Sequence, residues 1–258
     1  MLKAKKSYGQ HFLNDEGISE NIARSLQLTE TYHNKVLEVG PGQGMLTKYL
    51  ISCGYDLTVV EADRDMVAFL KKNYAEPLAG RIISEDFLKL KLNELYDGQF
   101  AIIGNFPYNI SSQIVFQCVE YRSQVVEMVG MFQKEMAERI IAPPGSKTYG
   151  VISVLVQAYF SGEYLFNVRP FSFDPPPNVE SGVIRLVRRA DYETLGCDEN
   201  QFRNVVKTAF GSRRKMMRNT LRALVSDDEK LKDPIFNERP EQLSVAQFVA
   251  LTRLIFNT

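Results

Sequence analysis

The residues with the clearest chemical potential form one tetrapeptide, Asn105-Phe106-Pro107-Tyr108, directly after the apolar run 100–104. Open α/β sheets bind ligands at the carboxyl ends of their strands, where this tetrapeptide is expected to lie. A side-chain amide that accepts hydrogen bonds, next to a ring that can stack, suits a planar heterocycle with an exocyclic amine. These residue types are suited to the methylation of adenine at N6.

Adenine N6 is a poor nucleophile because its lone pair is delocalised into the ring. The side-chain carbonyl of Asn105 and the backbone carbonyl of Phe106 can each accept one N6 hydrogen. These bonds favour a more tetrahedral nitrogen whose lone pair points at a methyl donor, while Tyr108 fixes the plane of the base. The alternative is an ordinary turn with Tyr108 in the core, since Asn and Pro are common turn residues.

A glycine-rich segment upstream offers a place for the donor. Gly40, Gly42 and Gly44 follow a strand predicted at 35–39, and glycine lets the backbone pass close to a ligand. A plain strand-to-helix turn is the weaker interpretation. The dinucleotide fingerprint G-x-G-x-x-G is broken at Met45, which argues against an NAD-dependent oxidoreductase.

Two carboxylates are placed to hold an adenosine-containing donor. Glu61 ends the second predicted strand and can accept hydrogen bonds from both ribose hydroxyls, a feature that NAD and S-adenosylmethionine sites share. Asp86 follows the third predicted strand and can accept from an adenine amine. Helix capping is the alternative for Asp86.

A second aromatic candidate stands in a proline-rich loop. Phe173 precedes the prolines at 175–177, which restrict the backbone. A stiff loop with an exposed ring could sandwich a flipped base opposite Tyr108. A connector whose phenylalanines belong to the core explains the same residues.

The elements that must position these residues follow an alternating pattern. Strands are predicted at 35–39, 57–61, 81–84, 100–104 and 125–132, and helices between them include 46–53 and 65–74. This alternation predicts an α/β fold with a mostly parallel sheet. A further strand at 182–187 is expected to close one edge of the sheet.

The pattern changes after about residue 189, where strand signals vanish. Helices are predicted at 199–210, 215–225 and 244–256, separated by Gly211 and by two X-Pro pairs. We therefore predict a catalytic domain at 1–188 and a small helical domain at 189–258.

Bulk composition narrows the class of protein. The chain has 258 residues, is 45% apolar, and balances 31 basic with 31 acidic residues, so only local charge can indicate a nucleic-acid partner. Its three cysteines show no CxxC spacing, and with two histidines they argue against a structural zinc site. No metal is expected. The apolar runs are too short to span a membrane, and a cytoplasmic location is expected.

Taken together, the motifs resemble the KsgA-type small-subunit ribosomal RNA adenine dimethyltransferases. The matching segments occur in order at 9–15, 38–42, 60–63, 85–86, 105–108 and 173–181. The resemblance covers nearly the whole chain. It implies a class I S-adenosylmethionine-dependent methyltransferase, Rossmann-like with a mostly parallel seven-stranded sheet and a small C-terminal helical domain.

The same resemblance implies an activity. S-adenosylmethionine would donate four methyl groups to N6 of two adjacent adenosines in the 3′-terminal hairpin loop of small-subunit rRNA, leaving S-adenosylhomocysteine. The small ribosomal subunit would be the partner, with a role in its biogenesis, and a monomer is expected.

Site residues carry over by position. The donor site implied is His11, Leu13, Gly40, Glu61, Asp86 and Asn105, to which the glycine loop adds Gly42; an N-terminal segment would fold over the donor. The chain has His11 where the family commonly has Asn, and Phe106 where it commonly has Leu. Cofactor binding and chemistry are expected to survive, but the larger ring of Phe106 is expected to narrow the pocket.

Basic residues concentrate in the segment 201–223, which has no acidic residue. Arg214, Arg218 and Arg222 recur every four positions, so a helix over 215–225 would place them on one face. Such a stripe suits a phosphate backbone, and a solvated helix face is the alternative. The predicted RNA-binding residues are Arg213, Arg214, Lys215, Arg218 and Arg222.

Three other functions stay open at this point. A large-subunit rRNA dimethyltransferase would share both the donor and the acceptor motifs. A DNA adenine methyltransferase would share the chemistry, and only the full-length resemblance counts against it. A ribosome-assembly factor would rely on binding more than on methylation.

Overall fold

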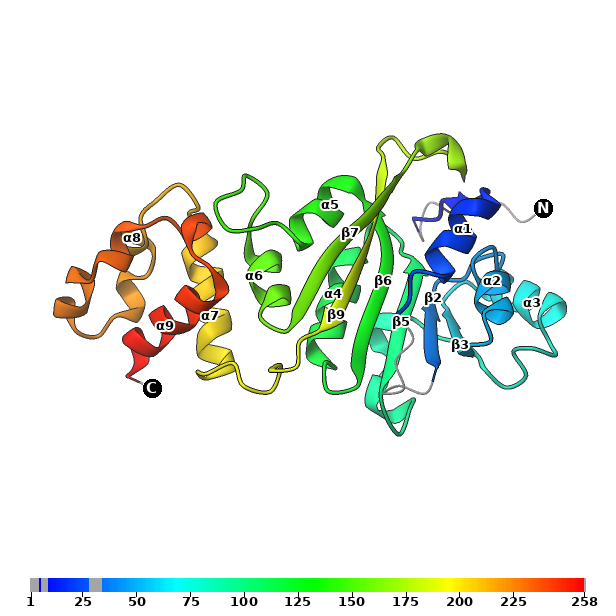
Figure 1. Cartoon of the computed structure of the whole chain (residues 1–258), viewed down its shortest axis with the longest axis horizontal. Coiled ribbons are helices and arrows are strands. Elements are labelled where there is room, and N and C mark those ends of the chain that lie inside the picture. Colours follow the sequence, from blue (N-terminus) through cyan, green and yellow to red (C-terminus); the bar gives the residue numbers. More distant parts are fainter. Residues whose placement is uncertain (1–4, 6–8, 28–33, 258) are drawn as a thin grey trace. The chain divides into compact units, whose positions relative to one another are not determined.

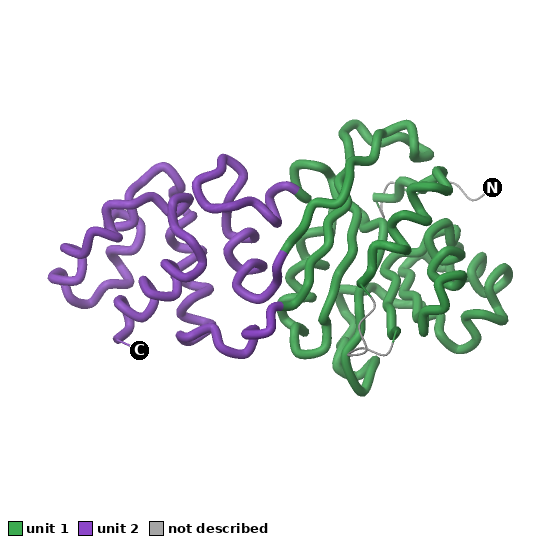
Figure 2. The backbone as a smooth tube through the Cα atoms, viewed as in Figure 1, with its two compact units in different colours: residues 1–137, 162–188 green, residues 138–161, 189–258 purple. Residues whose placement is uncertain are grey.

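The computed structural model describes residues 5, 9–27 and 34–257, and the chain forms two compact units (Figure 2). Unit 1 comprises residues 1–137 and 162–188, and unit 2 comprises residues 138–161 and 189–258. The chain passes from unit 1 into unit 2 after residue 188, and the functional division into a catalytic and a helical domain stays a prediction. The segment 138–161 belongs to unit 2, although it lies within the range predicted for the first domain.

Unit 1 is built on a seven-stranded sheet with the order β4-β3-β2-β5-β6-β9-β7 (Figure 1). The pairs that join β4, β3, β2, β5 and β6 are parallel, and β9 is antiparallel to β6. The strands are β2 (Lys35–Val39), β3 (Asp56–Glu61), β4 (Ile82–Ser84), β5 (Phe100–Asn105), β6 (Val125–Gln133), β7 (Phe160–Val168) and β9 (Ser181–Arg188). A separate two-stranded ladder pairs β1 (Phe12–Leu13) with β8 (Phe173–Asp174).

The helices of the chain are α1 (Glu16–Ala23), α2 (Thr47–Ser52), α3 (Arg64–Asn73), α4 (Ser111–Glu120), α5 (Lys134–Ile140), α6 (Val151–Gln157), α7 (Glu199–Phe210), α8 (Met217–Thr220) and α9 (Val245–Phe256). Short polar side chains cap the N-termini of several of these helices. Asp63 caps α3 by accepting from the Asp65 N–H at 3.0 Å, and Asp198 caps α7 by accepting from the Gln201 N–H at 2.8 Å.

The central strands are apolar because both faces of a parallel sheet are covered. Residues 100–103 of β5 are fully buried, and this strand ends at Asn105. In unit 2 a second core joins α6, α7 and α9, with Tyr149, Phe202 and Phe248 among its fully buried side chains. The sheet thus delivers the tetrapeptide 105–108 to its carboxyl edge, as predicted.

One prediction about the sheet is wrong, and one strand was not predicted. The strand at 182–187 was expected at an edge, but β9 lies between β6 and β7. The outer position is taken by β7, which the sequence did not reveal. Only Phe160 and Val168 of β7 are buried and it contains Gly162, so it lacks the alternation that marks a half-buried strand.

The predicted helix at 215–225 is also wrong. Only Met217–Thr220 is α-helical, and residues 222–224 form a separate 3₁₀ turn. Asn219 and Thr220 are weak helix formers, and a single turn gains little from its own hydrogen bonds. Burial of Met217, Leu221 and Val225 in the core of unit 2 fixes the path instead.

Candidate active site

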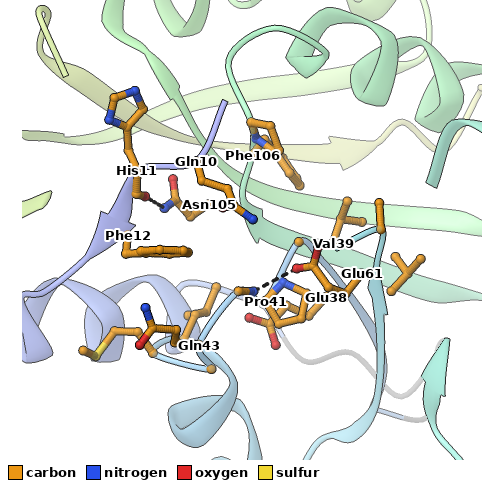
Figure 3. A pocket seen from close by; sticks show the side chains of 18 of the residues that line it. Gln10, His11, Phe12, Glu38, Val39, Pro41, Gln43, Glu61, Asn105 and Phe106 are labelled. Atoms are coloured by element: carbon orange, nitrogen blue, oxygen red, sulfur yellow. Dashed lines mark hydrogen bonds between the residues drawn. The ribbon is translucent and has the colours of Figure 1, made fainter. Parts of the chain in front are cut away.

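A cavity of about 1110 Å³ opens at the carboxyl ends of β2, β3 and β5 in unit 1 (Figure 3). The glycine loop 40–44, Glu61, Asp86 and the tetrapeptide 105–108 all line it. His11 and Leu13 of the N-terminal segment line it too. The predicted donor and acceptor residues therefore share one space, which is large enough for a cofactor and a base.

The glycine loop needs residues without side chains at two positions. Gly42 has φ +56°, and a Cβ there would stand 3.1 Å from the ring of Phe12, which lies across the loop (Figure 3). Gly44 has φ +81°, and its Cβ would come within 2.5 Å of the Tyr74 ring. Both backbone conformations strain residues with side chains.

Glu61 faces the cavity with its carboxylate held by backbone donors. One oxygen accepts from the Gly42 N–H at 3.1 Å and the other from the Asp63 N–H at 2.9 Å. Burial raises the pKa of Glu61, and these two N–H groups act in the opposite direction. The carboxylate is thus fixed against the loop, where each oxygen retains acceptor capacity for a ribose hydroxyl.

Glu38 is a functional candidate to which the sequence analysis assigned no role. It lies in β2, is 1% exposed, lines the cavity, and accepts from the Thr47 hydroxyl at 2.7 Å. Burial raises its pKa to about 8, the Thr47 bond opposes the shift, and the charge of Glu61 adds to it. A glutamate among the apolar residues at 36–39 of the predicted strand was the signal that could have found it.

The N-terminal segment closes one side of the cavity. The Lys5 ammonium lies 2.7 Å from the Asp63 carboxylate, which is 1% exposed, and Gln10 donates to the same carboxylate at 3.2 Å. The His11 ring bonds the Pro175 carbonyl through Nδ1 at 2.8 Å. The segment is therefore attached at both ends of the pocket wall. Lys6, the next basic residue of this N-terminal segment, lies outside the described residues.

Asn105 is oriented by this segment. Its side-chain N–H donates to the backbone carbonyl of His11 at 3.0 Å (Figure 3). One of the two amide N–H groups is thereby engaged, which fixes the orientation of the amide and leaves its oxygen available to accept from a ligand.

Tyr108 is held by two contacts. Its hydroxyl shares a hydrogen bond of 2.7 Å with the hydroxyl of Ser181, which is fully buried in β9. Its ring stacks on the His11 imidazole, with centroids 5.4 Å apart and an angle of 27° between the planes. Burial raises the pKa of Tyr108, so its hydroxyl stays neutral near pH 7.

Phe106 lines the cavity, but most of its ring packs into the protein, so the expected narrowing of the pocket stays a prediction. The side chain is only 1% exposed and meets Phe132 edge to face, with centroids 5.2 Å apart. A Cβ on Gly130 would stand 2.2 Å from the Phe106 ring, and one on Gly104 would stand 2.7 Å from it. The ring fills the space that these two glycines leave in β6 and β5.

Phe173 is not the exposed ring that the stacking prediction required. It is 3% exposed, belongs to the core of unit 1, and does not line the cavity. The reason is the β1–β8 ladder, which pairs Phe173 with Leu13 and directs the ring into the core beside it.

Asp86 has the capping role that was its alternative interpretation, and its role toward an adenine amine stays a prediction. It lines the cavity, and it caps a 3₁₀ helix (Phe87–Lys89) by accepting from the Leu88 N–H at 3.0 Å.

In the described part of the chain no cluster of three or more His, Cys, Asp or Glu residues could hold a metal ion, and no helix there is long and apolar enough to cross a membrane.

The predicted RNA-binding residues do not form one helical stripe. Arg213 donates to the Ser146 carbonyl at 2.9 Å, Arg218 bonds Asn237, and Arg222 pairs with Asp228 at 2.6 Å. Arg214 and Lys215 are exposed and precede α8. These basic residues all belong to unit 2, and among the described residues the side chains of Arg214 and Lys215 make no hydrogen bond or ion pair.

Comparison with known proteins finds relatives along almost the entire chain. A family model described as ribosomal RNA adenine dimethylase matches residues 1–255. The chain is 54% identical over 255 residues to ribosomal RNA small subunit methyltransferase A of Flavobacterium johnsoniae, covering 98% of this chain and 96% of the relative. It is 52% identical over 253 residues to the protein of the same name from Parabacteroides distasonis, covering 98% and 94%.

Two solved structures share the fold. A dimethyladenosine transferase from Plasmodium falciparum superposes with a TM-score of 0.79 at 23% identity, covering 96% of this chain and 98% of that one. The 23S rRNA methyltransferase ErmE superposes with a TM-score of 0.67 at 24% identity, covering 93% and 98%. The architecture is that of class I S-adenosylmethionine-dependent methyltransferases, as predicted.

Proposed function

The chain belongs to the ribosomal RNA adenine dimethylase family, and on that premise we propose that it dimethylates N6 of two adjacent adenosines in the 3′-terminal hairpin loop of small-subunit rRNA. The observation that carries the proposal is the shared cavity, in which Asn105 and Tyr108 stand beside the glycine loop and Glu61. Relatives at about half identity bear a small-subunit name, which favours this substrate over large-subunit rRNA.

The cavity fits S-adenosylmethionine, which supplies an electrophilic methyl group on a sulfonium. The loop at Gly42 approaches without a side chain, and Glu61 presents fixed carboxylate oxygens for ribose hydroxyls. Asp86 supplies an acceptor for an adenine amine. The residues we assign to this cofactor are His11, Leu13, Gly40, Gly42, Glu61, Asp86 and Asn105.

The acceptor residues activate the nitrogen. The Asn105 oxygen and the Phe106 carbonyl each accept one N6 hydrogen, and Tyr108 stacks on the base, so that the N6 lone pair is aimed at the methyl group. Pro107 restricts the backbone dihedral angles of the turn that positions these groups. The new N–C bond forms as the C–S bond breaks, and the cationic N6 then loses a proton to water. S-adenosylhomocysteine is the product, and no step requires a metal.

The RNA partner is bound by charge on unit 2 in this proposal. Arg213, Arg214, Lys215, Arg218 and Arg222 supply cations to the phosphate backbone, with Arg214 and Lys215 the most available. We propose that the protein acts as a monomer on the small ribosomal subunit and contributes to its biogenesis.

The test combines S-adenosylmethionine carrying a labelled methyl group with small subunits that lack methylation in the 3′ hairpin. Nucleoside mass spectrometry should detect dimethyladenosine with the parent protein. Asn105→Ala should lower the rate at saturating cofactor by about 10²–10³-fold, the typical cost of losing one preorganised polar group at a developing charge. Asn73→Ala removes an exposed side-chain amide of α3 that donates to the Phe69 carbonyl, and this matched control should behave like the parent.

Two outcomes would overturn the proposal. Product on naked large-subunit RNA or on DNA, but none on small subunits, would keep the chemistry and reject the substrate. Intact binding to small subunits without methylation of any nucleic acid would favour an assembly factor.

A further inference from the structure

The loop that leads from β7 to β9 exposes an aromatic ring, although not the predicted one. Phe171 is 70% exposed, the highest value for any large hydrophobic residue in the described part of the chain. Val179, at 45%, belongs to the same loop. Burying a phenylalanine side chain is worth about 1.5–3 kcal/mol, and the neighbouring Phe173 obtains that burial while Phe171 does not.

The backbone under Phe171 is well anchored. Ser172 accepts a hydrogen bond from the Asn14 N–H at 2.9 Å, and the next two residues form β8 against β1. Pro170 begins the 3₁₀ turn that carries the ring (Pro170–Ser172). A ring on a fixed backbone loses little conformational freedom when it binds a partner.

Phe171 is close along the chain to two residues of the cavity wall. Asp174 and Pro175, three and four residues after Phe171, line the cavity. Three residues of chain span at most about 11 Å, so the Phe171 Cα lies within that distance of the Asp174 Cα. The spacing is one to two nucleotides of a single strand, so a base next to one held in the cavity is within reach of Phe171.

The charge around the ring suits RNA. Arg169 is exposed, and it lies close enough to Glu180 to help lower the pKa of that carboxyl. The main cause of that lowering is Lys134, whose ammonium is 2.8 Å from Glu180. Glu180 directly precedes Ser181, the partner of Tyr108, which places these cations beside the acceptor residues.

We propose that Phe171 stacks on an unpaired nucleobase adjacent to the target adenosine, with Arg169 contacting the backbone of the same strand. The inference rests on the proposed function and adds a binding contact outside the cavity. Unpaired RNA bases are commonly held by aromatic stacking with basic residues nearby, and a stack tolerates any base.

Methylation kinetics on small subunits test the contact. Phe171→Ala should raise KM for subunits at least about 5-fold, the lower end of the effect of removing a base stack, with kcat and KM for S-adenosylmethionine unchanged. Phe171→Tyr should keep the parent KM because its ring still stacks. Phe116→Ala, which removes another partly exposed phenylalanine from α4, is the matched control and should leave KM unchanged.

Fluorescence anisotropy with a labelled RNA hairpin gives a second readout that needs no methyl transfer. Weaker binding by Phe171→Ala, at an unchanged melting temperature, supports the stack even if the proposed methylation substrate is wrong. Parent-like KM and parent-like hairpin affinity would overturn the inference. A KM effect on subunits with no effect on the hairpin would also overturn it, because the ring would then contact a ribosomal protein.

Discussion

Glu38 brings a carboxyl group into the buried strand β2, and its ionisation couples stability to pH. Its pKa in the folded protein is about 8, raised by burial, whereas an unfolded glutamate titrates near pH 4.3. Between these values the folded state holds a proton that the unfolded state has lost. The contribution of Glu38 to the free energy of unfolding is therefore fully present below about pH 4 and is lost as pH rises through about 8.

Glu38→Gln should remove this dependence. Glutamine keeps an oxygen that can accept from Thr47, but it does not ionise. The melting temperature of the variant minus that of the parent should therefore rise from pH 5 to pH 8 and stay constant above pH 9. Differential scanning calorimetry across this range measures the difference, with exposed Glu76→Gln as control. A difference independent of pH would contradict the assignment.

At the residue scale the sequence predicted which side chains meet but not how each is held. Spacing after strand ends placed Asn105, Glu61 and Asp86 around one cavity. Spacing could not show that His11 accepts from Asn105, because that bond joins segments 94 residues apart. It also could not separate Phe171 from Phe173, since their opposite exposures depend on the pairing of β8 with β1.

At the scale of elements, β5 and β6 together leave a space that the Phe106 ring occupies. Gly104 and Gly130 face each other in the parallel ladder, and their missing side chains admit the ring. Phe106 follows Asn105 and contributes the carbonyl proposed to accept from N6. The glycine pair is therefore a positioning device for the acceptor turn.

Gly130→Ala should push the Phe106 ring and misplace this turn. We expect kcat to fall about 10²-fold, since shifts of about 1 Å at reacting groups have that cost, while the dissociation constant for S-adenosylmethionine changes little. The new Cβ would also stand 2.7 Å from the Phe132 ring, so Phe106→Leu, which removes the closer clash, should restore part of the activity to the Gly130→Ala protein. Steady-state kinetics and calorimetric titration give the two readouts.

Gly98→Ala is the matched control, because a Cβ there meets nothing within 4 Å. If Gly130→Ala lost activity only in proportion to its unfolded fraction, or if Phe106→Leu did not rescue it, the glycine pair would have no positioning role.

The elements that the sequence predicted well are those with a strong pattern. The apolar runs of β2 and β5 and the capped helices α7 and α9 match closely. β7 was missed because few of its residues are buried, and the helix expected around α8 is interrupted because tertiary burial decides its path. Local signals fail where a segment is specified by its neighbours in space.

For the whole molecule, the two units divide the work in our proposal, with the cofactor on unit 1 and RNA charge on unit 2. Arg214→Glu combined with Lys215→Glu should weaken binding to the rRNA hairpin and flatten its salt dependence. If each cation contacts one phosphate, the slope of log affinity against log salt should drop by about two. Affinity for S-adenosylmethionine should not change.

The control is Lys71→Glu with Lys72→Glu in α3, two exposed cations of unit 1 whose reversal changes the net charge equally. Filter binding at several salt concentrations compares the two double variants. An equal loss in both would indicate a general effect of net charge, and no loss in the first would remove RNA binding from this part of unit 2.

The interrupted course of unit 2 along the chain also affects how the protein is made. Helix α6 ends at residue 157, and α9 begins 88 residues later, at residue 245. During translation the apolar side of α6 stays uncovered until the later helices of unit 2 are synthesised, while β7 and β9 emerge and join the sheet of unit 1. The nascent chain therefore carries an unfinished hydrophobic surface through about a third of its synthesis, a stage at which chaperones have a natural binding target.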